Sequence, residues 1–391
     1  MATVTKSIGT SSRDYSTITA WDADLDNTLV YISGDDAVGE CYNDSTFDES
    51  LVIDGGITIG LTSVTLTAAT SERHDGTAGT GVQWSWTGGN LATLCQLGLT
   101  TDSVVRVIEY IDFNGNNQNI LRLVYHGNPN AGSCTTRYSI MRQLVGVNYS
   151  TPVTLAIVSN RNNYFHNNIL YNCDTTAISN YRSAVGLASN GAIGSQEIYN
   201  CTIHNIASQS TSDIYGAYGY QSHSDATGEI LKNTIITSVN GNSPRSACFD
   251  FQSGASQPPS YAVYSHNISS DSSATGTGSL TNKTAVDQFV SIVGGSEDLH
   301  LKAGADAIGA GVDLGTTPAG VEVDIDGRDR DAEGDTWSIG ADQFVEILHR
   351  HFFTRLGLRA TPQAYWFWEG SRTVSEEEEG SKGKNFFIFF Y

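Results

Sequence analysis

The chain of 391 residues has 42 acidic and 21 basic residues, which gives a formal net charge of −21. This balance argues against binding to nucleic acid or to an anionic membrane, because both require a basic surface. Charged residues make up only 16% of the chain and 40 residues are glycine, a composition that favours short strands and many turns over helices.

The first predicted element is a short amphipathic helix within DYSTITAWDADL, residues 14–25. Ile18, Trp21 and Leu25 recur at helical spacing, so we expect residues 1–35 to form an N-terminal cap over the first coil of a repeat structure. The chain starts at Met1 without the apolar region of a signal peptide, and no run of 18 apolar residues occurs. We therefore expect neither export by a signal peptide nor a transmembrane helix.

A repeat of about 30 residues occupies the middle of the chain. Its first mark is an isoleucine beside polar residues or asparagine, with spacings of 29, 29, 34, 32 and 33 residues, at Ile111, Ile140, Ile169, Ile203, Ile235 and Ile268. Its second mark is a ladder of short β-prone runs between these isoleucines, at residues 121–125, 154–158, 184–188, 215–220 and 247–251. A β-sandwich would not give two matched ladders.

Two strands per unit, about six units and no helical periodicity predict a parallel β-solenoid over residues 36–295. Its coils would stack at about 4.8 Å. The isoleucines are expected to point inward from coil to coil. Four asparagines beside them are expected at left-handed turn positions, where they can bond to the next coil: Asn167, Asn200, Asn233 and Asn267.

The solenoid is followed by DLHLKAGADAIGAGVDLG at residues 298–315 and DIDGRDRDAEGDTWSIGADQF at residues 324–344. We expect residues 296–344 to form a C-terminal cap, because an open last coil exposes unpaired backbone groups. The octapeptide DIDGRDRD suggests a calcium loop, but its glycine comes fourth rather than sixth and Arg328 occupies a ligand position. A cap turn is the favoured interpretation.

Residues 345–391 differ in character from everything before them. Apolar residues recur at helical spacing from Ile347 to Leu356, and YWFW, four consecutive glutamates and NFFIFFY follow. Aromatic segments of this kind are too apolar to remain in water. We expect this tail to be an assembly element that is buried against a neighbouring chain.

The opening segment and the closing segment at residues 298–344, but not the tail, resemble those of right-handed parallel β-helix proteins of the pectate-lyase-like kind that phages and environmental viruses encode. The closing segment is similar to their AIDAG…DxDG…DxGAxEF arrangement, with Gly309 where aspartate is usual and Gln343 where glutamate is usual. The opening TKSIGTSSRDYSTITAWDADL also resembles their front, so the resemblance covers about residues 4–344. It implies an all-β, single-stranded right-handed parallel β-helix with a helical N-terminal cap and a C-terminal cap. It says little about activity, because this fold carries lyases, hydrolases, adhesins and virion parts alike.

Candidate catalytic residues are few. Glu197 and Glu229 precede Ile203 and Ile235 by six residues each, so they are expected on adjacent coils about 5 Å apart, the carboxylate separation of a retaining glycosidase. The favoured alternative is two solvated carboxylates, with Lys232 nearby. No motif joins Arg182, Lys232 and Arg245 into a lyase site. His74 and Asp75 are expected to serve a turn, and three tyrosines are expected to pack on a strand rather than to bind sugars: Tyr215, Tyr218 and Tyr220.

Six cysteines are spread singly, with no CxxC pair, and the nine histidines show no metal-ligand spacing. We therefore expect buried reduced thiols, no metal site and no cofactor.

Taken with the resemblance, the sequence predicts a structural virion protein made in a host cytoplasm: a tail spike, a fibre or a capsid surface protein. Expected partners are copies of itself in a homotrimer, other virion proteins and host surface polysaccharide, but not nucleic acid or membrane. Catalysis is not expected. Two alternatives stay open: a polysaccharide lyase or glycoside hydrolase, and an extracellular adhesin or filament subunit.

Overall fold

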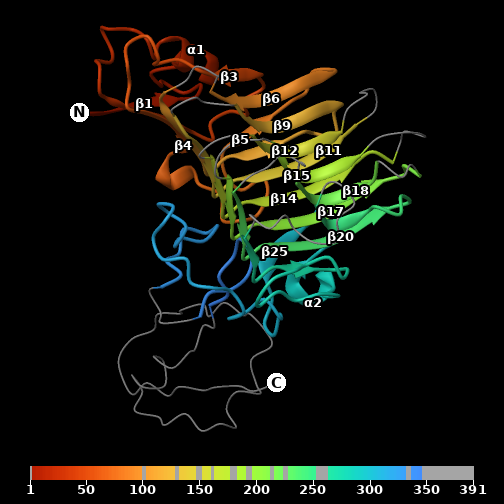
Figure 1. Cartoon of the computed structure of the whole chain (residues 1–391). Helices are drawn as coiled ribbons and strands as arrows, with labels where there is room; N and C mark the ends of the chain where they lie inside the picture. The colour runs from red at the N-terminus through yellow and green to blue at the C-terminus, as the bar shows by residue number, and fades with distance from the viewer. Residues whose placement is uncertain are drawn as a thin grey trace, which may run out of the picture. The chain divides into compact units, whose positions relative to one another are not determined.

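Parallel strands stack coil upon coil in the computed structural model of the chain (Figure 1). The structure describes residues 2–98, 103–127, 132–146, 152–159, 163–176, 183–190, 196–211, 215–222, 228–251, 263–331 and 336–345. In these parts of the chain, none of the helices has the length and apolar character to cross a membrane.

Three parallel sheets form the walls of the coils. Sheet A contains, in spatial order, β1 (Thr3–Ile8), β2 (Asp36–Cys41), β4 (Ser63–Ala68), β7 (Val105–Glu109), β10 (Cys134–Arg137), β13 (Asn163–His166), β16 (Gln196–Tyr199), β19 (Glu229–Lys232) and β22 (Val263–Ser265). Sheet B contains β5 (Gln83–Ser85), β8 (Asp112–Asn114), β11 (Ile140–Val145), β14 (Ile169–Asp174), β17 (Thr202–Ser208), β20 (Ile235–Gly241) and β23 (Ile268–Ser269). Sheet C contains β3 (Leu51–Ile53), β6 (Leu91–Leu97), β9 (Ile120–His126), β12 (Val153–Ser159), β15 (Ala184–Asn190), β18 (Ala217–Ser222) and β21 (Ala247–Phe251).

Each complete coil takes one strand from each sheet, in the order A, B, C along the chain. In the described residues six coils are complete, from β4–β5–β6 to β19–β20–β21. The protein is therefore the predicted all-β, right-handed parallel β-helix. It has three strands per coil rather than the expected two, because segments such as FHNNILYN contain the end of one strand, a sharp bend and the next strand.

The predicted inward column of isoleucines is wrong. Four of them share one register but lie on the outer face of sheet B: Ile140, Ile169, Ile235 and Ile268. Ile111 is not in this register, because Ile140 pairs with Asp112. Ile169 pairs with Thr202, and Thr202 pairs with Ile235, so Ile203 lies one residue out of register. The spacing of 34 residues from Ile169 to Ile203 is one residue longer than this coil. Because side chains alternate along a strand, Ile203 projects from the opposite face of sheet B.

Only one of these two faces lines the interior. A Cβ on Gly186 of sheet C would lie 2.6 Å from Ile203, so Ile203 points inward across the coil. A Cβ on Gly340 of the C-terminal segment would lie 2.8 Å from Ile235, so Ile235 points outward and is covered by that segment. Both isoleucines are fully buried, which is why apolar pattern alone does not tell the two faces apart.

The corner between sheets A and B is a column of left-handed residues. One residue per coil has a φ between 50° and 59°, at Tyr110, Tyr138, Asn167, Asn200, Asn233 and His266. Asn233 Nδ2 donates to Asn200 Oδ1 at 3.0 Å, which confirms the predicted bond between coils. Asn267 is not in the column, since His266 takes that place and Asn267 Oδ1 accepts from the Thr234 N–H at 2.9 Å.

The N-terminal cap contains α1 (Ile18–Ala23), whose N-cap Thr17 accepts a hydrogen bond from the Ala20 N–H. As predicted, Ile18, Trp21 and Leu25 are fully buried. A Cβ on Gly39 of β2 would lie 2.8 Å from the Trp21 ring, so the helix fills the opening of the first coil. Sheet A itself begins earlier than expected, because β1 pairs with β2.

The C-terminal segment, residues 285–345, contains α2 (Ala285–Gln288) and the antiparallel pair β24 (Phe289–Ser291) and β25 (Asp298–Leu301). It does not only close the last coil, as was expected, but runs along the A/B corner. Three corner asparagines donate from Nδ2 to backbone carbonyls of the segment. Asn233 donates to Val312 at 2.8 Å, Asn200 to Val321 at 3.0 Å and Asn167 to Gly320 at 3.1 Å. The segment thus joins successive coils on their outer side.

Candidate functional site

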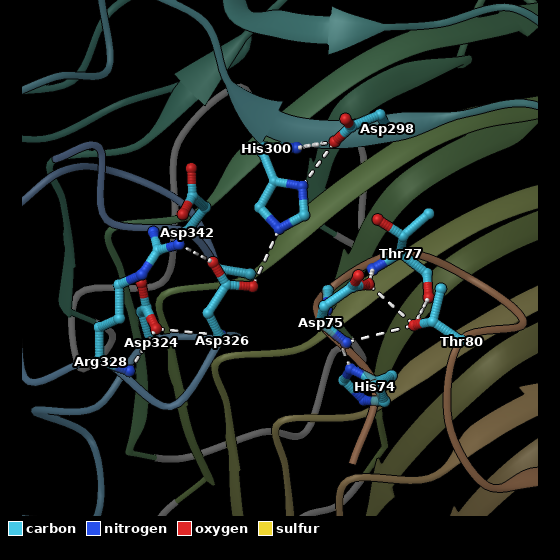
Figure 2. A network of polar contacts seen from close by, with 12 residues as sticks. His74, Asp75, Thr77, Thr80, Asp298, His300, Asp324, Asp326, Arg328 and Asp342 are labelled. Atoms are coloured by element: carbon cyan, nitrogen blue, oxygen red, sulfur yellow. Dashed lines mark hydrogen bonds and ion pairs between the residues drawn. The ribbon is translucent and has the colours of Figure 1, made fainter. Parts of the chain in front are cut away.

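Three separate parts of the C-terminal segment bring a histidine and several carboxylates together (Figure 2). Strand β25 supplies Asp298 and His300, which project from the same side of the strand because they are two residues apart. The turn at residues 324–328 supplies Asp326, and residues 336–345, which include a bend at 339–341, supply Asp342. One potential ligand atom each from His300, Asp326 and Asp342 lies within 4.8 Å of the other two.

His300 is held between two carboxylates. Its Nδ1 lies 2.5 Å from Asp298 Oδ1 and its Nε2 lies 3.0 Å from Asp326 Oδ1. Burial lowers the pKa of His300, but the hydrogen bond to Asp326 and the charges of Asp342 and Asp326 outweigh this effect and raise the pKa to about 10. At neutral pH the ring is an imidazolium that donates to both neighbours.

Asp342 is the most enclosed member of the cluster, with 3% of its surface exposed. The Leu301 N–H donates to its Oδ2 at 2.7 Å. Its Oδ1 is also buried, and no hydrogen-bond donor reaches it from the part of the chain that the structure describes. Burial raises the pKa of Asp342, and the charge of His300 acts in the opposite direction.

Asp326 is placed by a turn that Asp324 organises. Asp324 Oδ1 accepts from the N–H groups of Asp326 and Arg328 at 3.0 and 2.8 Å. Burial raises the pKa of Asp324 to about 6. Arg328 forms an ion pair with Asp326 Oδ2 at 2.9 Å. In the octapeptide DIDGRDRD, Asp324 therefore organises the expected cap turn.

A loop from the N-terminal coils lies against this cluster. A Cβ on Gly76, whose φ is +80°, would lie 2.3 Å from His300 Nε2 and 2.8 Å from Asp326 Oδ1. His74 is buried; its Nε2 lies 2.8 Å from the Tyr138 carbonyl and its Nδ1 accepts from the Gly76 N–H at 3.2 Å. Asp75 Oδ1 accepts from the Thr77 N–H at 3.0 Å. His74 and Asp75 thus shape the loop that brings Gly76 to the cluster.

Glu197 and Glu229 are not brought together. Glu229 pairs in register with Gln196, and Glu197 with Ile230, so the two carboxylates project from opposite faces of sheet A. Glu229 is buried inside the coil, where it accepts from Ser222 Oγ at 2.8 Å and Tyr264 Oη at 2.5 Å. Glu197 is partly exposed and accepts from a tyrosine hydroxyl on its own strand.

The other candidates from the sequence are dispersed as well. Arg245 Nη2 forms an ion pair with Asp250 Oδ1 of sheet C at 3.3 Å, whereas Lys232 is on β19 of sheet A. Tyr218 and Tyr220 are fully buried on β18, as the packing interpretation predicts, whereas Tyr215 precedes this strand and is partly exposed. Arg182 lies outside the described residues.

The cluster around His300 has the ligand types of a divalent metal site: one imidazole and two carboxylates. Sequence reasoning missed it because its members are 26 and 16 residues apart in three segments. No short motif links them, and the turn and the strand that position them are recognisable only in the folded chain.

No protein-family model matches the chain, and no curated protein does. Among solved structures, the chain is similar to the pectin methylesterase from Aspergillus niger, with 14% sequence identity and a TM-score of 0.35. The match covers 71% of this chain and 84% of that chain. A likeness at this level carries no argument about activity, and the β-helix rests on the strand pairing described above.

Proposed function

We propose that the protein is a structural β-helix of a virion, a tail spike, fibre or capsid surface protein whose role is to be a stiff scaffold. The proposal joins the resemblance of the chain's ends to viral β-helix proteins with the chemistry of the described outer surface. Homotrimers, other virion proteins and host polysaccharide are its proposed partners, and the virion is its proposed location.

The outer face of sheet A carries the proposal. One outward column crosses all nine strands in register: Thr5, Val38, Thr65, Val107, Thr135, Tyr164, Glu197, Ile230 and Val263. Only Glu197 in this column is charged. Threonine and branched aliphatic side chains suit a surface that packs against another surface. The next outward column of the same face carries charges, and two of them, Glu109 and Arg137, form an ion pair with each other at 2.7 Å.

Contacts between coils support the scaffold role further. In sheet B, Asn205 Nδ2 donates to Asn172 Oδ1 in the preceding coil at 2.7 Å, and Asn172 Nδ2 donates to Glu297 Oε1 at 2.7 Å. These bonds join two coils to each other and to the C-terminal segment. Side chains committed in this way stiffen the stack and are not free to bind substrate.

The enzyme alternative is tested with the purified full chain on a panel of acidic and neutral polysaccharides. We expect neither unsaturated products nor new reducing ends. Activity that disappears in Glu197→Gln, with Glu40→Gln on the same face as the matched control, would establish the enzyme instead.

The virion assignment is tested on particles from the source culture, purified by density gradient and washed in high salt. An antibody raised against residues 1–344 should detect the chain at the particle density. Detection only among free proteins of the lysate or medium would favour the adhesin or filament alternative.

A further inference from the structure

We propose that His300, Asp326 and Asp342 form a site for one divalent transition-metal ion. The bound ion would link three parts of the C-terminal segment to one another. The inference is independent of the virion assignment, because it concerns the chain's own residues and their chemistry.

The ligand atoms are already gathered. The three side chains come from β25, from the turn at residues 324–328 and from residues 336–345, and their ligand atoms lie within 4.8 Å of one another. Metal–ligand bonds of about 2.0–2.2 Å place ligand atoms of one ion about 3–4 Å apart. A small inward movement of these side chains would complete the coordination.

Asp342 supplies a second and independent observation. It is 3% exposed, and its Oδ1 is buried with no donor from the described residues. A buried carboxylate oxygen without a partner is costly, because it has lost its water and gained nothing in return. A cation between Asp342, Asp326 and His300 would satisfy this oxygen.

The surroundings of His300 fit a ligand. Asp298 lies 2.5 Å from Nδ1 and fixes the ring, so that Nε2 faces Asp326. A carboxylate behind the second ring nitrogen is the usual support of a metal-bound histidine, and it makes the imidazole a better donor.

Binding must displace one proton. His300 Nε2 donates its proton to a hydrogen bond with Asp326. On metal binding this proton would leave to water, and the Nε2 lone pair would coordinate the metal ion. Asp326 Oδ1 would then coordinate the metal in place of accepting the hydrogen bond. One nitrogen and two oxygens favour Zn²⁺ or Mn²⁺ over the larger Ca²⁺, which prefers six to eight oxygen ligands. Water would fill the remaining positions.

The test uses the full chain, freed of metal by a chelator that is then removed. Calorimetric titration with ZnCl₂ in 0.15 M salt should show one equivalent bound per chain, and Zn²⁺ should raise the Tm. Asp342→Asn keeps an oxygen for the Leu301 N–H but removes the charge, and it should abolish the one-equivalent isotherm and the Tm rise. Asp298→Asn should weaken binding by about 10–100-fold.

Asp313→Asn is the matched control, because Asp313 is an exposed aspartate in the same segment whose Oδ1 accepts only a local N–H, that of Gly315. It should bind Zn²⁺ like the unaltered chain. Wild-type binding below one equivalent, or equal binding by Asp342→Asn, would overturn the proposal.

If Asp342→Asn does not fold, the unaltered chain still decides the question. One equivalent of Mn²⁺ should broaden the ring-proton NMR signal of His300 more than that of any other histidine. Broadening elsewhere, with the His300 signal unchanged, would rule the site out.

Discussion

Gly76 sets how closely the N-terminal coils approach the C-terminal segment. Its φ of +80° favours glycine over any other residue. A Cβ at this position would also clash with atoms of His300 and Asp326. Gly79, in the same loop, also has a φ of +80°, but a Cβ there would meet nothing within 4 Å. An alanine at Gly79 would cause backbone strain alone, whereas an alanine at Gly76 would cause backbone strain and a steric clash.

We expect Gly79→Ala to lower the free energy of unfolding by about 1–2 kcal/mol, the cost of a left-handed alanine. Gly76→Ala adds the clash with His300 and should cost at least about 1 kcal/mol more. Urea denaturation of both variants measures the difference. Equal losses would mean that the loop does not press against the cluster.

Three buried histidines should make the fold sensitive to acid. Burial lowers the pKa of His126 and His166 to about 3 and that of His204 to about 4. Since the unfolded value is about 6.5, the unfolded chain takes up protons that the folded chain refuses. The stability from these groups is present above pH 6.5 and is lost as the pH falls toward 4 and 3.

Other groups act in the opposite direction. Burial raises the pKa of Asp22 and Asp324 to about 6, so the folded chain gains stability from them as the pH falls from 6 toward 4. His300, with a pKa of about 10, already contributes most of its stability at pH 7. For these six groups the balance is a net loss of about 2 kcal/mol between pH 7 and pH 5.

The measurement is the free energy of unfolding by urea at pH 7 and pH 5. In His126→Gln, where an amide can replace the bond to Thr136 Oγ1, the loss should be smaller by up to about 2 kcal/mol. A loss that is the same in this variant would remove His126 from the account.

At the scale of elements, the A/B corner joins the coils to the C-terminal segment. Asn200 has a φ of +50°, donates to the Val321 carbonyl at 3.0 Å and accepts from Asn233 at 3.0 Å. It therefore links two coils and the segment. Asn240, on β20, is exposed and makes one local bond, to the Ser238 carbonyl.

We expect Asn200→Ala to cost about 2–4 kcal/mol, from two lost hydrogen bonds and a left-handed alanine. Asn240→Ala should cost less than about 1 kcal/mol. Hydrogen exchange should show the amides of residues 312–321 less protected in the first variant alone. Unchanged protection there would mean that the corner does not hold the segment.

The elements also show how far the sequence alone leads. The 30-residue period predicts coils because each coil repeats the same burial pattern. The left-handed bend at Asn167 hides the boundary between β13 and β14, so two strands were read as one. The coil from Ile169 to Thr202 spans 33 residues, so Thr202 is the residue equivalent to Ile169 in the next coil. The isoleucine of that segment, Ile203, is one residue further along and therefore out of register.

The candidate site was less predictable than the fold. The expected positions of Glu197 and Glu229 depend on Ile203 and Ile235 being in register, and they are not, so the two carboxylates lie on opposite faces of sheet A. The cluster around His300 depends on a turn and a strand meeting in space. No periodicity in the chain encodes that meeting.

At the scale of the whole molecule, residues 1–344 form one compact unit. The aromatic tail follows Phe344, and residues 346–391 lie outside the described part of the chain. The proposal that this tail makes much of the contact between chains rests on its sequence. Burying apolar surface is favourable by about 25 cal/mol per Å², so aromatic clusters are more stable buried between chains than exposed to water.

Truncation after Phe344 should leave a folded β-helix that is monomeric or associates much more weakly than the full chain. The contacts are expected to be apolar, so the full chain should stay associated in high salt, which screens its charge of −21. Light scattering of both chains measures this. The same oligomeric mass for both would show that the tail is not the assembly element.

Electron cryo-microscopy of the full-length protein tests the structural role most directly. We expect a closed assembly of three chains about one axis, with parallel β-helices packed side by side and the outer face of sheet A buried between them. Single chains with that face open to solvent would contradict this proposal.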